Sequence, residues 1–265
     1  MTLLSIVLGT LAAGIGSVWL AAALSFGLLA RYTQHMLSLA AGALLGTAFL
    51  HLLPEAFESA APPQQLFVTL LLGLVFFFLL DKAELWHHGH EHGHSHSHIH
   101  SHSHEEHQGN GAHHHGSGGW AVLAGDSVHC FGDGILIASA FIADWRLGCL
   151  AALAVLAHEV PHHMGDLAVL RHTSSNRRAA LLKVTLAGSI TALGGLLGYW
   201  LVDSLKHYLV YFLVVASSRF IYVALSDFIP QLQKRLSLSE TLAQICWLAV
   251  GIGLVSAVGF AVHGH

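Results

Sequence analysis

The strongest constraint on the fold is the length of the apolar runs in the chain. Crossing the hydrocarbon core of a bilayer takes about 20 mainly apolar residues in one helix. The sequence contains eight runs of about this length, at residues 3–29, 35–57, 64–86, 120–143, 147–170, 179–202, 207–230 and 240–262. Only 10% of the residues are charged, against roughly 25% in a soluble domain. The sequence therefore predicts an all-α integral membrane protein, a single transmembrane domain of eight helices over residues 1–265.

The longest connection between the predicted helices, residues 87–119, is rich in histidine, serine and glycine and has little to bury. It holds 14 of the 24 histidines. We expect it to be disordered until metal binds, and to act as a metal acceptor, buffer or sensor. A low-complexity linker with dispensable histidines is the alternative. The alternating histidines are His90, His92, His94, His96, His98, His100, His102 and His104.

The distribution of lysine and arginine predicts the orientation in the membrane, because cytoplasmic loops carry the excess of these residues. With both termini outside, the outer loops hold only Arg146 and Lys206, and Arg219 lies inside the helix predicted at 207–230. The cytoplasmic connections then hold Arg31, Lys82, Arg171, Arg177, Arg178, Lys183, Lys234 and Arg235. This places the His-rich loop in the cytoplasm. The net charge of −4 gives no reason to expect a nucleic-acid partner.

A weak internal similarity relates the first three predicted helices to the last three. The segment from His51 to Glu55 in the second helix resembles the segment from Asp227 to Gln231 in the seventh. The two segments are five helices apart, so the repeats would cross the membrane in opposite directions. Inverted repeats are typical of transporters that bind substrate near the bilayer midplane. The central helices, 120–143 and 147–170, would then carry the site.

The helix predicted at 147–170 contains the most polar intramembrane stretch. On a helix, His158 and His162 lie four residues apart, as do Glu159 and His163, so each pair shares a face. Pro161 lacks an N–H group and is expected to bend the helix. Ionisable side chains at membrane depth are costly, and they indicate a functional site. Two imidazoles and a carboxylate that converge at a proline predict a site for a divalent cation.

The preceding helix, predicted at 120–143, presents a matching polar face. Asp126, His129 and Asp133 are spaced three and four residues apart, and therefore lie on one side. At a rise of about 1.5 Å per residue they reach the middle of a core about 30 Å thick, as do His158 and His162 from the other direction. The short turn after residue 143 makes the two helices antiparallel neighbours. Their polar faces can therefore meet.

Imidazole combined with carboxylate predicts the metal class. This set suits zinc, and also cadmium, iron, manganese, cobalt or nickel, whereas calcium and magnesium prefer sites made of oxygen alone. Cys130 either adds a soft thiolate, which would favour zinc or cadmium, or is a small buried residue. We expect the metal to be transported cargo, with no resident cofactor required and no enzymatic activity.

Four motifs in order resemble the ZIP (Zrt/Irt-like) family of divalent metal transporters, of the prokaryotic type. His129-Cys130-Phe131-Gly132-Asp133-Gly134 is similar to the family's His-Asn-x-x-Asp-Gly. His158-Glu159-Val160-Pro161-His162, followed by Gly165-Asp166, is similar to its His-Glu-x-Pro-His. The segments from His51 to Glu55 and from Tyr222 to Pro230 resemble two further family motifs. The resemblance covers nearly the whole chain.

The resemblance implies transport of metal toward the cytoplasm by a homodimer, with an elevator-like motion of the first, fourth, fifth and sixth helices against the rest. It implies a mononuclear or binuclear site in which His129, Asp133 and His162 form the main site. Cys130, His158 and Glu159 would form its neighbour. With both termini outside, the expected location is a bacterial inner membrane.

The chain departs from the family pattern at three positions. Cys130 stands where asparagine is usual, and His163 where many relatives have glutamate. The helix predicted at 179–202 offers Ser189 and Thr191 but no carboxylate. These changes affect the neighbouring site, the one formed by Cys130, His158 and Glu159.

Six further polar residues are expected to support ligands or line the ion's path. They are His51, Glu55, Asp126, His163, Asp166 and Asp227. For His51, Glu55 and Asp227 the alternative is an ordinary helix end at the interface. For Asp126 and Asp166 the expected role is orienting the ligands, as carboxylates around metal-bound imidazoles commonly do.

Two other functions fit parts of the sequence. His158-Glu159-x-x-His162 matches the His-Glu-x-x-His motif of zinc metalloproteases, some of which act within membranes. Against this, Pro161 interrupts a helix that the motif needs to be regular. A metal exporter with a His-rich cytoplasmic loop is the other alternative, although such exporters usually have six helices.

Overall fold

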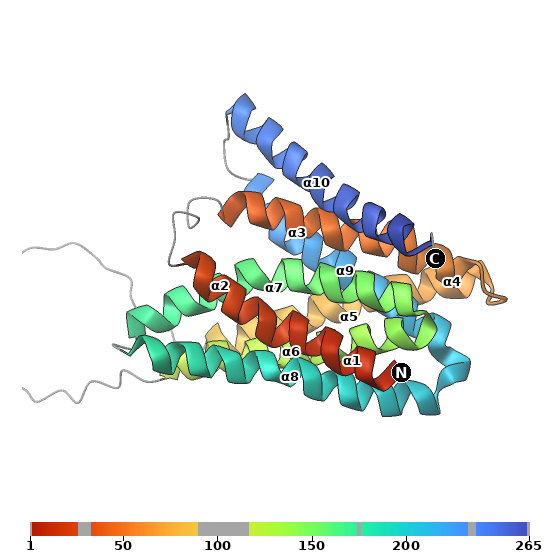
Figure 1. The fold of residues 1–265 in the computed structure, drawn as a ribbon, viewed down its shortest axis with the longest axis horizontal. Helices are drawn as coiled ribbons and strands as arrows, with labels where there is room; N and C mark the ends of the chain where they lie inside the picture. Colours follow the sequence, from red (N-terminus) through yellow and green to blue (C-terminus); the bar gives the residue numbers. More distant parts are fainter. Residues whose placement is uncertain (1, 26–32, 90–116, 174–175, 233–236, 264–265) are drawn as a thin grey trace, which may run out of the picture.

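The molecule is a bundle of long helices (Figure 1). The computed structural model describes residues 2–25, 33–89, 117–173, 176–232 and 237–263, and every regular element in these segments is helical. The predicted all-α class is therefore confirmed. The histidines from His90 to His104 lie outside the described residues, so the predicted disorder of their loop stays a prediction.

The first two predicted helices each contain one π-helical turn. The first consists of α1 (Thr2–Leu11), η1 (Ala12–Gly16) and α2 (Ser17–Ser25), which follow one another without a gap. The second consists of α3 (Thr33–Thr47), η3 (Ala48–Leu52) and α4 (Leu53–Phe57). In a regular helix the ring of Pro54 would clash with the carbonyl group of Leu50. The wider π turn directly before α4 accommodates this proline.

Six longer helices make up the rest of the described chain. They are α5 (Pro63–Gly89), α6 (Ser117–Ala143), α7 (Trp145–Thr173), α8 (Arg177–Ser204), α9 (Leu209–Leu232) and α10 (Leu238–His263). A single 3₁₀ turn, η4 (Lys206–Tyr208), joins α8 to α9. The side chain of Asn176 caps α8, because its Oδ1 atom accepts hydrogen bonds from the backbone N–H groups of Arg178 and Ala179.

Helix α7 continues through Pro161 as one helix from Trp145 to Thr173. The helix predicted across this residue is therefore present, and the bend expected at Pro161 stays a prediction. A proline removes a single backbone hydrogen bond, and the bonds on either side remain. Pro161 is also buried, so packing against neighbouring helices holds the two parts of α7 together.

Seven spans in the described residues are long and apolar enough to cross a membrane. They are Thr2–Leu24, Gln34–Phe57, Pro63–Ala83, Leu123–Ala143, Arg177–Val202, Lys206–Ser226 and Leu238–Ala261. Helix α7 is not among them, although its 29 residues give it the length. The polar residues in its second half lower its hydropathy. The chain is thus an integral membrane protein.

Helices α6 and α8 make the most extensive contact among the described helices, and glycines at their interface allow a close approach. A Cβ atom at Gly134 of α6 would collide with the carbonyl oxygen of Thr191. One at Gly194 of α8 would collide with the carbonyl oxygen of Phe131. Membrane helices approach closely where small residues face each other, since lipid provides no hydrophobic driving force between them.

The remaining contacts surround α6 and α7 with other helices. Helix α7 packs against α6, α2 and α3, whereas α9 packs mainly against α5 and α3. Helix α10 packs on α3, and in Figure 1 these two lie on the side of the bundle opposite α8. The polar faces of α6 and α7 are thus enclosed by the bundle.

Candidate metal site

The polar residues of α6 and α7 meet in the interior of the bundle. Helix α6 contributes Asp126, His129, Cys130 and Asp133, and α7 contributes His158, Glu159, His162, His163 and Asp166. All are buried except His129 and His162, which are partly exposed. The spacing of three and four residues within each helix brings these side chains onto the facing surfaces. The polar faces of α6 and α7 therefore face each other, as the sequence predicts.

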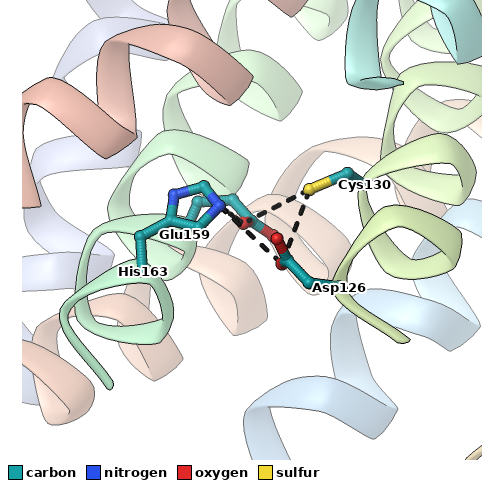
Figure 2. Close-up of side chains that lie close together, drawn as sticks. All are labelled: Asp126, Cys130, Glu159 and His163. Atoms are coloured by element: carbon teal, nitrogen blue, oxygen red, sulfur yellow. Dashed lines mark hydrogen bonds and ion pairs between the residues drawn. The ribbon is translucent and has the colours of Figure 1, made fainter. Parts of the chain in front are cut away.

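One set of four side chains is fully buried. Figure 2 shows Asp126 and Cys130 of α6 facing Glu159 and His163 of α7. Nε2 of His163 lies 3.2 Å from Oε2 of Glu159 and 3.8 Å from Oδ1 of Asp126. The sulfur of Cys130 lies 3.7 Å from Oδ1 of Asp126 and 3.9 Å from Oε2 of Glu159. Ligands around a tetrahedral zinc ion are about 3.3–3.8 Å apart, so this set requires only a small contraction to bind one.

A second set brings three side chains together on the other side of Glu159. Nε2 of His129 lies 3.2 Å from Nε2 of His158 and 3.4 Å from Oε1 of Glu159. One potential ligand atom from each of the three lies within 4.8 Å of the other two. Glu159 thus offers one carboxylate oxygen to each of two neighbouring sets.

The third set lies around His162. Its Nδ1 atom is 3.7 Å from Oδ1 of Asp126 and 3.5 Å from Oδ2 of Asp166. Asp126 therefore belongs to this set and to the buried one. The three sets form a continuous row, linked by the two shared carboxylates.

Buried polar atoms in this row lack hydrogen bonds. Among the described residues, they include Oδ2 of Asp126, Oε1 of Glu159, Nδ1 of His162, Nε2 of His163 and Oδ2 of Asp166. Buried polar groups without partners cost free energy, and buried carboxylates without a counter-charge cost more. A divalent cation would provide a partner for several of these atoms at once. The donor atoms therefore fit a metal ion of the imidazole- and carboxylate-binding class.

A cavity of about 140 Å³ opens onto this row. The donor residues that line it are Asp126, His129, His158 and His162. Its remaining walls come from Asp81 of α5, Gly125 of α6, and Val223 and Ser226 of α9. A cavity of this volume holds several water molecules, so an ion with part of its hydration shell can reach the imidazoles.

Asp133 is placed differently from the other predicted ligands. Its Oδ1 atom accepts a hydrogen bond from Nε of Arg219 at 2.5 Å, and its Oδ2 atom lies 3.7 Å from Nε2 of His129. It belongs to none of the three sets described above. The predicted main site of His129, Asp133 and His162 therefore does not stand as one cluster in this conformation; His129 and His162 instead stack with ring centroids 5.2 Å apart.

Two residues of this region had no role in the sequence analysis. Arg219 was noted only for its position inside an apolar helix, and that position is the signal that marks it as functional. Ser17 of α2 carries no such signal. Its hydroxyl oxygen lies 3.0 Å from Nδ1 of His163 and donates to the carbonyl oxygen of Gly14 at 2.6 Å. Ser17 thus holds the far side of the His163 ring.

Three further pathway residues were predicted from the sequence, His51, Glu55 and Asp227. His51 is in η3, where a Cβ atom at Gly259 of α10 would lie 2.6 Å from its ring. Glu55 is exposed in α4. The side chain of Asp227 falls outside the part of the chain that the structure describes. Neither His51 nor Glu55 joins the described sets of potential ligands.

The chain is similar in sequence to a known protein family and to several named proteins. The family profile described as ZIP Zinc transporter matches residues 1–259. The zinc transporter ZIP13 of Pongo abelii is 30% identical over 274 residues, which cover 92% of this chain and 75% of that protein. The human zinc transporter ZIP4 is 39% identical over 115 residues, 43% of this chain. The zinc transporter foi of Drosophila melanogaster is 33% identical over 137 residues, 51% of this chain. The matched regions span only 18% of human ZIP4 and 19% of foi.

Proposed function

The chain belongs to the ZIP zinc transporter family, and we propose that it carries divalent transition metal ions, zinc foremost, across a membrane toward the cytoplasm. One observation carries the proposal: three linked sets of imidazole, carboxylate and thiol groups lie between α6 and α7, inside a bundle of membrane-spanning helices. Ionisable groups in that position mark an ion pathway. The similar proteins ZIP4 and ZIP13 are named as zinc transporters, which supports the proposal.

In the proposed mechanism, the ion exchanges hydration water for the side chains in stages. It enters the cavity lined by His129, His158 and His162, and then binds His129, His158 and Glu159. The fully buried set provides a second position, to which Cys130 adds a soft ligand that favours zinc or cadmium over manganese. The shared carboxylate of Glu159 lets an ion pass from one set to the next without losing its charged ligand. Iron, cobalt and nickel are the other candidate ions.

The proposed architecture follows the family resemblance. All eight apolar helices, α7 included, cross the bilayer, and the first three and last three form inverted repeats. Helices α1, α2, α6, α7 and α8 move as an elevator against the rest, in a homodimer. Both termini lie outside, the His-rich loop lies in the cytoplasm, and the membrane is a bacterial inner membrane. The excess of lysine and arginine on the predicted cytoplasmic side supports this orientation.

Metal flux into vesicles tests the function. We expect purified full-length protein to carry zinc and cadmium into proteoliposomes with saturable kinetics, and calcium and magnesium far more slowly. Expression in cells should raise cellular zinc. A fall in cellular zinc would identify an exporter and contradict the direction. Cleavage of a membrane substrate without any flux would support the metalloprotease alternative, which neither the family nor the named relatives favour.

Deleting residues 90–115 should leave flux intact. These residues lie outside the helices that hold the three sets of ligands, and they are expected to buffer or sense metal rather than to conduct it. We expect the initial rate of zinc uptake to stay within about twofold of wild type, since a segment made mostly of histidine, serine and glycine has little apolar surface to bury. Metal retention by the purified protein should fall. Loss of all flux in the deletion variant would assign the loop to the transport pathway.

A further inference from the structure

Arg219 stands at the edge of the metal site. It lies on α9, and its residue is only 4% exposed. Its Nε atom donates to Oδ1 of Asp133 at 2.5 Å, and a terminal nitrogen donates to the carbonyl oxygen of His129 at 2.9 Å. The ring of Phe77 on α5 lies under the guanidinium carbon at 5.4 Å. Both of these hydrogen bonds are made to α6, the helix that carries Asp126, His129 and Cys130.

The space for this guanidinium is provided by α6 itself. A Cβ atom at Gly132 would lie 3.4 Å from a terminal nitrogen of Arg219. A methyl group at this position would therefore be in van der Waals contact with the guanidinium. The guanidinium thus packs directly over a glycine that precedes its carboxylate partner in the sequence.

A buried arginine in a membrane protein is costly unless it is paired, and it keeps its charge because it does not lose its proton. Here it neutralises Asp133, which would otherwise be a buried carboxylate without a counter-charge. The other oxygen of Asp133 lies 3.7 Å from Nε2 of His129, a potential ligand. Asp133 therefore lies between a fixed cation and an imidazole that could bind a metal ion.

We propose that Arg219 is a tethered competitor of the transported ion: it occupies Asp133 when the site is empty, is displaced when metal binds there, and returns to drive the metal off. This inference rests on the proposed transport function. Its physical basis is that two positive charges held within a few ångströms of each other in a low-dielectric interior repel one another strongly. Arg219 thereby lowers the affinity of the site and makes release possible.

The competition also couples ion binding to the packing of the bundle. Arg219 belongs to α9, which packs mainly on α5 and α3, whereas Asp133 belongs to α6, which packs most closely on α8. The contact between Arg219 and Asp133 ties these two groups of helices together. An ion that takes Asp133 loosens that tie, so occupancy of the site changes the contact between α6 and α9.

The first test measures zinc affinity of the purified full-length protein by competition with a chelator. We expect Arg219→Gln to bind zinc about tenfold or more tightly than wild type, because a nearby positive charge is removed. Arg219→Lys keeps the charge and should stay closer to wild type. The matched control is Arg178→Gln, an exposed arginine in the first turn of α8, which should leave the affinity unchanged.

The decisive comparison uses Asp133→Asn. If the two cations compete for this carboxylate, Arg219→Gln should tighten zinc binding in the wild-type background but not in the Asp133→Asn background. The double variant also removes both buried charges, so it remains measurable if the single variant folds poorly. Equal tightening in both backgrounds, or no tightening in either, would overturn the proposal.

Flux measurements separate competition from a purely structural role. With Arg219→Gln we expect KM for zinc to fall together with kcat, since the ion binds more tightly and leaves more slowly. A lower kcat with unchanged or higher KM would contradict the proposal. Wild-type protein that binds zinc but moves none would refute the transport function itself, and this outcome is seen before any variant is compared.

Discussion

Replacing Glu159 with glutamine is expected to reduce zinc flux at least a hundredfold while leaving the protein folded in the membrane. Glu159 is the carboxylate shared by the set with His129 and His158 and the set with Cys130 and His163. Glutamine has the same shape but no charge, so both sets lose their common anionic ligand in one step. Removing one partner of a buried charge interaction costs about 3–5 kcal/mol, which corresponds to a factor of about a hundred or more in binding.

The measurement is zinc uptake by proteoliposomes, together with zinc binding by the same preparation. The matched control is Glu240→Gln, at an exposed glutamate in the first turn of α10 whose carboxylate contacts Ser237. This variant should transport at the wild-type rate. Zinc flux by Glu159→Gln within a few-fold of wild type would remove Glu159 from the pathway, and with it the link between the two sets.

The second large effect is expected on assembly of the bundle. Changing Gly134 to alanine places a methyl group against the backbone of α8, at the carbonyl oxygen of Thr191 and the amide nitrogen of Gly195. Backbone atoms cannot turn aside as a flexible side chain does, so α6 and α8 must separate. We expect the free energy of unfolding to fall by about 3 kcal/mol, which is at the upper end of the range for overpacking. Because α6 carries four of the polar residues of the site, zinc binding should weaken as well.

The change in stability is measured by heating the detergent-solubilised protein and recording the temperature at which it stops being monodisperse. Gly253→Ala in α10 is the control, since a Cβ atom there meets no other atom within 4 Å. In a helix, alanine is favoured over glycine by roughly 1 kcal/mol, so this variant should be equally or more stable. Equal stability of the two alanine variants would show that α6 and α8 do not pack as closely as described.

The helices were predictable because apolar runs of membrane length leave few alternatives. Helix α6 begins three residues before the predicted start and ends at the predicted residue, and α8 is two residues longer than predicted at each end, because frayed turns and polar residues blur the pattern there. The π turns were not predicted, since they depend on how η1 and η3 fit neighbouring helices. The single helix predicted across Pro161 is present as α7.

The facing of α6 and α7 followed from residue spacing, because positions three and four apart share a face of any helix. The grouping of the ligands did not. Whether Asp133 joins His162 or turns to another partner depends on Arg219, which lies 86 positions further along the chain. Spacing within a helix says nothing about a contact between α6 and α9. That contact became visible only when the helices were placed against each other.

The hydrogen bond between Ser17 and His163 determines which nitrogen of that ring carries hydrogen. A hydroxyl group has one proton, and Ser17 gives it to the carbonyl oxygen of Gly14. The contact at 3.0 Å must therefore be a donation from Nδ1 of His163 to Ser17. In the neutral ring, Nε2 then has a bare lone pair, and it faces the carboxylates of Glu159 and Asp126. A serine on α2 thus favours the tautomer in which the Nε2 lone pair of His163 points toward the two carboxylates, where it is free to bind a metal ion.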